Sequence, residues 1–249
     1  MNKLLEIKNL RKYYHDPKSE ILAIDNISLT INENEFISIV GTSGCGKSTF
    51  LSILAGIEEK SNGEIIFNKE NFKIGYMLQK DSLFPWRTIL DNCLIGLEIK
   101  NELTESKKMK VKTLLEKYGL KDFINKYPSS LSGGMKQRVA LIRTLALDPD
   151  ILLLDEPLSA LDYQTRLALS NDLYNIIKQE KKTAIMVTHD LGEAISMSDK
   201  IIVLTKRPSK VKRIHKIYYS NKKTPMENRD TEEFKNYYNE IWKELDINV

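Results

Sequence analysis

The chain of 249 residues contains very little cysteine, only Cys45 and Cys93, which lie far apart. Two distant thiols give no disulfide framework, so a disulfide-stapled secreted domain is excluded and a reducing compartment is expected. No run approaches the roughly 18 apolar residues that a membrane-spanning helix needs. The first residues, MNKLLEIKNLRKYY, become charged too early for a secretory signal. If the protein works at a membrane, we expect another chain to hold it there.

The chain also lacks a large excess of charge of either sign. It has 38 Lys and Arg against 34 Asp and Glu, a formal net charge of +4. So small an excess does not require a nucleic-acid partner, although it is compatible with a surface that faces anionic lipid. The hydrophobic fraction of 41% and charged fraction of 29% are typical of a soluble globular protein. The length suits one domain, with or without a small lobe.

The first third of the chain has the pattern of strands followed by a glycine-rich loop. Apolar residues alternate with polar ones over 27–31, which predicts a half-buried strand. The apolar run FISIV at 36–40 predicts a buried strand and leads directly into the glycine-rich residues 41–49. A helix is expected from Lys47, with Gly56 as its C-cap. This order is the context that a phosphate-binding loop requires.

The middle of the chain has helical periodicity, and strands return after it. One helix is predicted over 104–119, and a second follows the Ser-Gly-Gly sequence and is closed by Pro149. Continuous apolar runs at 151–155 and 183–187 predict strands of a parallel sheet that is covered on both faces. The residues 167–179 between them are predicted to form the crossover helix.

The glycine-rich residues GTSGCGKST match the pattern G-x-x-x-x-G-K-[ST]. Glycines allow a tight turn whose N–H groups point at phosphate oxygens, and the next helix presents its positive end to the same anion. Lys47 can reach the β- and γ-phosphates, and the Ser48 hydroxyl can ligate Mg²⁺. The expected nucleotide-binding residues are Gly41, Thr42, Ser43, Gly44, Cys45, Gly46, Lys47, Ser48 and Thr49. The structural alternative is a glycine-rich turn with a solvated lysine.

Two carboxylates stand at the end of the apolar run 151–155. Asp155 suits Mg²⁺, which takes hard oxygen ligands, often through water. Glu156 is the candidate that polarises the attacking water, a contribution of typically ~10²–10⁴ in rate. The structural alternative is that these acids cap a helix beginning at Pro157. Their combination with the phosphate loop favours the catalytic interpretation.

The stretch LSGGMKQRVALIRTLALDPDILLLDEPLSALD at 131–162 carries a resemblance to ATP-binding-cassette (ABC) ATPases that covers nearly the whole chain. The resemblance implies an α/β P-loop fold with a mostly parallel core sheet, an antiparallel β lobe near the N-terminus and a helical lobe. It implies one domain over residues 1–249, with a helical subdomain at about 85–148 and a C-terminal strand and helix extension at about 206–249. It also implies the reaction ATP + H₂O → ADP + phosphate with Mg²⁺.

The resemblance assigns roles to residues that would be unremarkable alone. It implies that His189 contacts the γ-phosphate and that Gln79 touches Mg²⁺ with Ser48 and Asp155. The catalytic residues implied are Glu156, His189, Gln79 and Lys47. Without the resemblance, Gln79 is equally well a surface residue, and a histidine after a strand is more often structural. The adenine needs a flat partner, and the family's aromatic residue aligns better with Tyr14 than with Tyr13, although core packing is the alternative for either.

Ser132, Gly133 and Gly134 stand at a predicted helix N-terminus and expose donors to an anion. A second phosphate-binding helix end is redundant within one domain, so we expect it to close on the nucleotide of a partner. The resemblance implies a head-to-tail homodimer that forms on ATP binding, with Asp162 at the dimer seam. The alternative is an ordinary helix cap. Met135 stands where the family's commonest form has glutamine, which puts in doubt only contacts of that side chain.

The stretch YMLQKDSLFPWRTILDNCLIGLEI carries a narrower resemblance, to the nitrate, sulfonate and taurine branch of ABC importers. Phe84, Pro85 and Trp86 lie just beyond Gln79, where the family docks its membrane subunits. Trp86 is either an anchor for such a contact or a residue packed inside the helical lobe. The implied partners are membrane permease subunits and, through them, an extracytoplasmic solute-binding protein. The implied location is the cytoplasmic face of the cell membrane.

Two other functions are compatible with an ABC ATPase. A soluble ATPase acting on nucleic acid or ribosomes typically carries a coiled-coil insert or two cassettes, and no nucleic-acid partner is expected here. A catalytically silent ATP-binding scaffold is disfavoured by Glu156 and His189.

Residues 206–223 contain eight Lys or Arg and no acid, so they face either anionic lipid or, as a solvated strand, water. A last helix is predicted to begin at Thr231.

Overall fold

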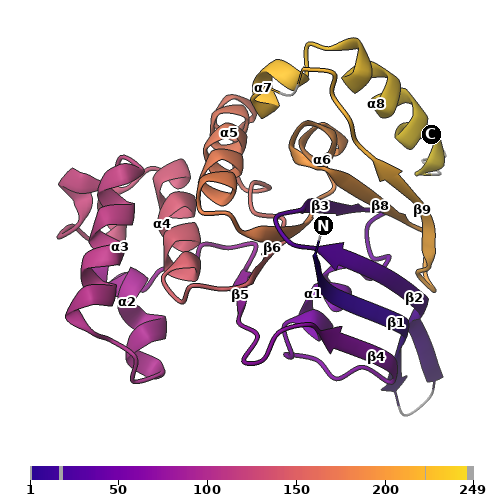
Figure 1. Cartoon of the computed structure of the whole chain (residues 1–249), viewed down its shortest axis with the longest axis horizontal. Helices are drawn as coiled ribbons and strands as arrows, with labels where there is room; N and C mark the ends of the chain where they lie inside the picture. Colours follow the sequence, from indigo (N-terminus) through magenta and orange to yellow (C-terminus); the bar gives the residue numbers. More distant parts are fainter. Residues whose placement is uncertain (1, 17–18, 222, 246–249) are drawn as a thin grey trace.

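The structure is a computed structural model that describes residues 2–16, 19–221 and 223–245. Two sheets lie beside a group of helices, as Figure 1 shows. The smaller sheet is antiparallel, with the strand order β2-β1-β4. Its strands are β1 (Lys3–Asp16), β2 (Ser19–Asn32) and β4 (Asn62–Phe67). The expected strand over 27–31 lies in β2, and its apolar side chains are buried, so the predicted antiparallel lobe is confirmed.

The larger sheet has the strand order β5-β6-β7-β3-β8-β9 and is parallel except for the last pair. Its strands are β3 (Phe36–Val40), β5 (Ile74–Met77), β6 (Ile151–Asp155), β7 (Thr183–Val187), β8 (Lys200–Leu204) and β9 (Val211–Lys216). The runs predicted to be buried are almost entirely so. Because β6, β7 and β3 are parallel neighbours, the segments that follow them meet at one edge of the sheet.

In the described part of the chain, every α-helix except α1 begins after a residue whose side chain caps it. Thr104 and Thr231 accept hydrogen bonds from the backbone N–H three residues later, as predicted. The crossover helix begins earlier than expected, because Asp162 caps it by accepting from the Thr165 N–H. The helices are α1 (Lys47–Leu54), α2 (Ile89–Ile99), α3 (Glu105–Lys117), α4 (Gly133–Leu145), α5 (Tyr163–Gln179), α6 (Leu191–Met197), α7 (Pro225–Asn228) and α8 (Glu232–Glu244), with 3-10 turns at Lys121–Phe123 and Pro128–Ser130.

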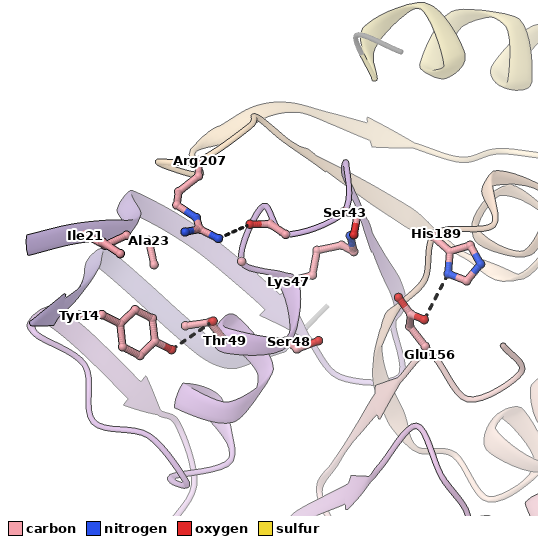
Figure 2. A pocket seen from close by; sticks show the side chains of 12 residues that line it. Tyr14, Ile21, Ala23, Ser43, Lys47, Ser48, Thr49, Glu156, His189 and Arg207 are labelled. Carbon is pink, nitrogen blue, oxygen red and sulfur yellow. Dashed lines mark hydrogen bonds and ion pairs between the residues drawn. The ribbon is translucent and has the colours of Figure 1, made fainter. Parts of the chain in front are cut away.

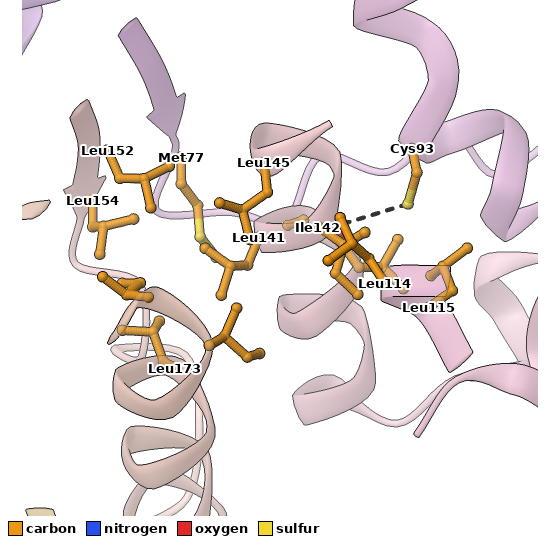
Figure 3. Packing of buried hydrophobic residues seen from close by; sticks show 14 of the residues in the cluster. Met77, Cys93, Leu114, Leu115, Leu141, Ile142, Leu145, Leu152, Leu154 and Leu173 are labelled. Carbon is orange, nitrogen blue, oxygen red and sulfur yellow. Dashed lines mark hydrogen bonds between the residues drawn. The ribbon is translucent and has the colours of Figure 1, made fainter. Parts of the chain in front are cut away.

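Helices α2, α3 and α4 pack on one another at one end of the molecule (Figure 1). Their buried side chains belong to the same apolar cluster as one face of the larger sheet. Figure 3 shows this continuity, from Cys93, Leu114 and Leu115 through Ile142, Leu141 and Leu145 to Met77, Leu152, Leu154 and Leu173. The helical group therefore shares its core with the sheet, and a movement of one is resisted by the packing of the other.

The basic stretch 206–223 includes β9, and some of its cations pair with acids of the same chain; Lys222 lies outside the described residues. Lys210 pairs with Asp25 at 2.9 Å, and Arg213 pairs with Glu240 and Glu244 of α8. His215 is buried and lies 2.9 Å from the Glu244 carboxylate. The pairs of Arg213 and His215 join α8 to the edge strand β9, which favours a structural interpretation of this part of the stretch over a lipid-facing one.

A buried carboxyl group lies at the start of α6. Glu193 is 2% exposed, and its Oε2 accepts a hydrogen bond of 2.8 Å from the Thr188 hydroxyl. Burial, with the nearby charge of Asp190, raises the pKa of Glu193 to about 7 despite the opposing charges of Arg166 and Arg229. Because the pKa of Glu193 is higher in the folded chain than in the unfolded chain, ionising this carboxyl group lowers the free energy of unfolding. The loss begins as the pH rises above the unfolded pKa and is complete above about pH 7.

We therefore expect Glu193→Gln to stabilise the fold in a pH-dependent way. The gain in the free energy of unfolding is small near pH 5 and rises toward a plateau above pH 7, on the order of 3 kcal/mol at most. Thermal melts of the variant and the parent at pH 5 and pH 8 measure it. Glu232→Gln, at an exposed carboxylate of α8, is the matched control. An equal difference between variant and parent at both pH values contradicts the prediction.

Candidate functional site

The glycine-rich loop leaves β3 and enters α1 at Lys47. Gly44 and Gly46 have φ angles of +71° and +110°, a backbone region that glycine adopts without strain. The Lys47 Nζ donates to the carbonyl oxygens of Gly41 and Thr42 at 2.8 and 3.1 Å, so the side chain lies along its own loop. Cys45 is buried beneath the loop, and burial raises the pKa of its thiol, which suits a small filler.

A cavity of about 720 Å³ lies against this loop. Figure 2 shows Tyr14 at one side of it and Glu156 with His189 at the other. The side chains come from both sheets, from the loop and from the segment after β8. The lining residues are Tyr14, Ile21, Ala23, Ser43, Gly44, Gly46, Lys47, Ser48, Thr49, Glu156, His189 and Arg207. The fold thus gathers most of the predicted phosphate-binding residues around one space.

Asp155 and Ser48 form an oxygen-rich pair beside the cavity. The Ser48 hydroxyl donates to Asp155 Oδ1 at 3.0 Å, and the Tyr76 hydroxyl donates to Oδ2 at 3.2 Å. Burial raises the pKa of Asp155 above its usual range. A hydroxyl and a half-buried carboxylate are the hard donors that Mg²⁺ takes, so this pair fits the expected cation. Gln79, predicted as a third ligand, is hydrogen-bonded elsewhere.

Glu156 joins Gln79 and His189 at the far side of the cavity. Its Oε2 lies 3.2 Å from His189 Nδ1 and accepts from Gln79 Nε2 at 3.1 Å. Gln79 Nε2 also lies 3.2 Å from the Ser159 hydroxyl. Glu156 has a φ of +46°, a strained conformation for a side chain of this type, and its N–H bonds Val187 O at 2.9 Å. The strand end thereby holds three predicted catalytic side chains in one hydrogen-bonded group.

The two tyrosines of the first strand have different surroundings. Tyr14 is 37% exposed, lines the cavity, and its hydroxyl donates to Glu58 Oε2 at 2.5 Å. Burial and this hydrogen bond raise the pKa of Tyr14. Tyr13 is absent from the lining, and its backbone N–H bonds the Ser61 hydroxyl. Between the two aromatic residues, the geometry favours Tyr14 as the partner of a flat ring.

Three lining residues were missed by the sequence analysis. Ile21 and Ala23 belong to β2, and Ile21 is paired directly with Tyr14 across the antiparallel sheet. Arg207 lies in the basic stretch that the sequence singled out only as a surface for lipid or water. No local motif marks these residues, because they reach the cavity through strand pairing and a distant loop.

Ser132, Gly133 and Gly134 do not line the cavity of their own chain. The Ser132 hydroxyl caps α4 by accepting from the Met135 N–H at 3.4 Å. A Cβ on Gly133 would lie 3.1 Å from Leu161, and one on Gly134 would lie 3.4 Å from Thr165. The start of α4 therefore packs against the turn that contains Asp162. Figure 1 places α4 away from α1, with β5 and β6 between them.

The sequence matches the ABC transporter family over residues 24–159. It is 44% identical to the uncharacterized ABC transporter ATP-binding protein YtlC of Bacillus subtilis, over 97% of this chain and 95% of that one. It is 40% identical to the aliphatic sulfonates import ATP-binding protein SsuB of Bacillus cereus, over 87% of this chain and 86% of that one. Among the described residues, no helix combines the length and apolar character needed to cross a membrane.

The fold is also similar to a solved dimeric structure, the ATP-binding cassette MJ0796 in a post-hydrolysis state bound to ADP and phosphate. The TM-score is 0.72 with 32% sequence identity, over 87% of this chain and all of that chain. The α/β cassette fold with its mostly parallel sheet and antiparallel lobe, expected from the sequence, is confirmed.

The contrast between the tyrosines predicts a difference in nucleotide binding. Tyr14→Ala removes the ring at the cavity wall and is expected to weaken ATP binding by about tenfold, the usual scale of base stacking. Tyr13→Ala, one residue away, is the matched control and leaves the affinity near that of the parent. Equilibrium titration with a fluorescent ATP analogue measures both. A larger loss in the Tyr13 variant contradicts the assignment.

Proposed function

Because the chain belongs to the ABC transporter family and hydrolyses ATP, we propose that it is the motor subunit of an importer. Two copies close on two ATP molecules, hydrolysis reopens them, and separate membrane permease subunits convert this movement into transport. The whole chain acts as one cassette, in which residues of about 85–148 form a helical subdomain. The strand and helix at about 206–249 form an extension, whose residues 246–249 lie outside the described part of the structure.

The proposed mechanism assigns one task to each side chain around the cavity. Mg²⁺ would be held by Ser48, Asp155 and Gln79, and would neutralise charge on the phosphates. Lys47 leaves its loop carbonyls and donates to the β- and γ-phosphates. Glu156 takes a proton from the attacking water as the bond from the γ-phosphorus to the bridging oxygen breaks, which yields ADP and phosphate. His189, 3.2 Å from Glu156, orients that carboxylate and contacts the γ-phosphate.

One observation carries the two-copy arrangement: Ser132, Gly133 and Gly134 lie outside the cavity of their own chain. Their helix end presents hydroxyl and N–H donors to an anion, and no phosphate-binding loop of this chain faces them in the structure's described part. A second copy placed head to tail supplies that anion. Asp162, an exposed cap of α5 packed near this helix end, then lies at the seam between the two copies.

Glu156→Gln tests both the base and the dimer. The amide keeps the shape but cannot take a proton, so phosphate release is expected to fall by at least about 100-fold while ATP still binds. The trapped ATP holds two copies together, which size-exclusion chromatography with light scattering detects. Glu64→Gln, at an exposed carboxylate of β4, is the control. Phosphate release at the parent rate contradicts the base assignment, and a strictly monomeric variant with Mg·ATP and permease contradicts the shared site.

The segment between Gln79 and α2 is the proposed docking site for the permease. Trp86 is 71% exposed, so the alternative that it packs inside the helical lobe is wrong. Its ring lies 5.3 Å from that of the half-buried Phe84. The buried Asn92 side chain donates to the backbone of residues 84, 87 and 88 and accepts from the Phe84 N–H. The backbone on both sides of Trp86 is thus hydrogen-bonded, which places the exposed Trp86 ring beside the half-buried Phe84, where an interface anchor could act.

Trp86→Ala is expected to weaken assembly with the permease while leaving the isolated subunit intact. Truncation of a central aromatic anchor typically costs at least about 2 kcal/mol of binding, or more than tenfold in affinity. Pull-down of the permease and basal ATPase activity of the isolated subunit are measured together. Trp242→Ala, at a 44% exposed tryptophan on α8, is the matched control. Equal permease capture by both variants and the parent contradicts the docking site.

We further propose a small oxyanion, of the nitrate, sulfonate or taurine class, as the imported solute. The support is the LFPWRT segment and the similarity to SsuB, which is described as an aliphatic sulfonates import protein. An extracytoplasmic binding protein delivers this solute to the permease, and the present subunit sits on the cytoplasmic face. Reconstituted transporter whose ATPase activity responds to an alkanesulfonate supports this class, whereas a response to nucleic acid or ribosomes supports the soluble ATPase alternative.

A further inference from the structure

The segment between β8 and β9 brings one basic side chain to the phosphate loop. Arg207 lines the same cavity as Tyr14 and Lys47. Its Nη2 donates to the carbonyl oxygen of Gly44 at 3.1 Å. Figure 2 shows the guanidinium on one side of Ala23 and the ring of Tyr14 on the other. Arg207 therefore closes a side of the cavity that none of the sequence motifs occupies.

The backbone around Arg207 is held in place rather than left as a free loop. The Thr205 N–H donates to Lys210 O at 3.0 Å, and the Lys210 N–H donates to the Thr205 hydroxyl at 2.9 Å. The buried Ser209 exchanges backbone hydrogen bonds with β2, through Ala23 O at 3.0 Å and the Asp25 N–H at 2.9 Å. These bonds fix the segment beside the loop, so the guanidinium is positioned before any ligand arrives.

The charge of Arg207 has no counter-ion among the residues that the structure describes, whereas Lys210 and Arg213 in the same basic stretch pair with acids. A guanidinium has five N–H donors, and Gly44 uses one. Next to a loop that turns its N–H groups toward phosphate, a positioned guanidinium favours an anion over a neutral group. The neighbouring Lys206 does not line this cavity; it lines a second one, together with Arg207 and loop residues 42–45.

We propose that Arg207 is a nucleotide-binding residue whose guanidinium contacts the phosphate chain of the bound nucleoside di- or triphosphate while it braces Gly44. The inference rests on the proposed placement of the nucleotide between Tyr14 and the phosphate loop. Guanidinium and phosphate form charge-assisted hydrogen bonds, so the contribution of Arg207 increases with the number of phosphates. Adenine and ribose alone gain little from this charge.

The test compares three variants in calorimetric titrations with AMP, ADP and ATP in the presence of Mg²⁺. Arg207→Gln keeps a donor for Gly44 but removes the charge, and is expected to weaken ADP and ATP binding by about tenfold and AMP binding less. Arg207→Lys keeps the charge and recovers most of the affinity. Lys206→Gln makes the same change of charge one residue away and binds like the parent.

Parent-like affinity of Arg207→Gln for ADP and ATP overturns the inference, as does an equal loss for all three nucleotides. An equal loss in Lys206→Gln also overturns it, since the effect is then a general one of surface charge. Melting temperatures without nucleotide check the fold, and Arg207→Lys decides the matter if the Gln variant is unstable. Tyr14→Ala in the same titrations tests the nucleotide's placement separately, because that variant keeps Arg207.

Discussion

The parallel pairing of β6, β7 and β3 is the constraint on which the site depends. The phosphate loop follows β3, the two carboxylates end β6, and His189 comes two residues after β7. These segments are more than 100 residues apart at the extremes, and only the common direction of the strands brings them to one edge. A change that shifts the register of one strand would separate Asp155 from Ser48 of the loop, even with every motif intact.

The helical group is built into this arrangement rather than attached to it. Its buried side chains continue into the core beneath the sheet, and Arg143 of α4 donates to the backbone carbonyls of Asp81 and Ser82 just after Gln79. The segment that reaches Glu156 through Gln79 is thereby bonded to the same helix that carries Ser132. Hydrogen bonds at Gln79 and at residues 81 and 82 therefore connect Glu156 to helix α4.

The sequence predicted the parts of the site that are contiguous in the chain. The phosphate loop and the acidic strand end depend on local backbone rules, so their spacing reveals them. Ile21, Ala23 and Arg207 could not be found in this way, because strand pairing and a loop near residue 207 bring them to the cavity. The crossover helix was predicted to begin at residue 167, but α5 begins at Tyr163. The side chain of Asp162, a predicted seam residue, also caps the helix and so sets this earlier start.

Helix α4 has thirteen residues, which at 1.5 Å per residue makes a rod about 20 Å long. The serine proposed to cover a partner's nucleotide stands at its beginning, and Arg143, bonded to the segment next to Trp86, stands in its last turn. In the proposed transporter, a displacement of the segment near Trp86 would therefore be carried along α4 to Ser132, over the length of this one helix.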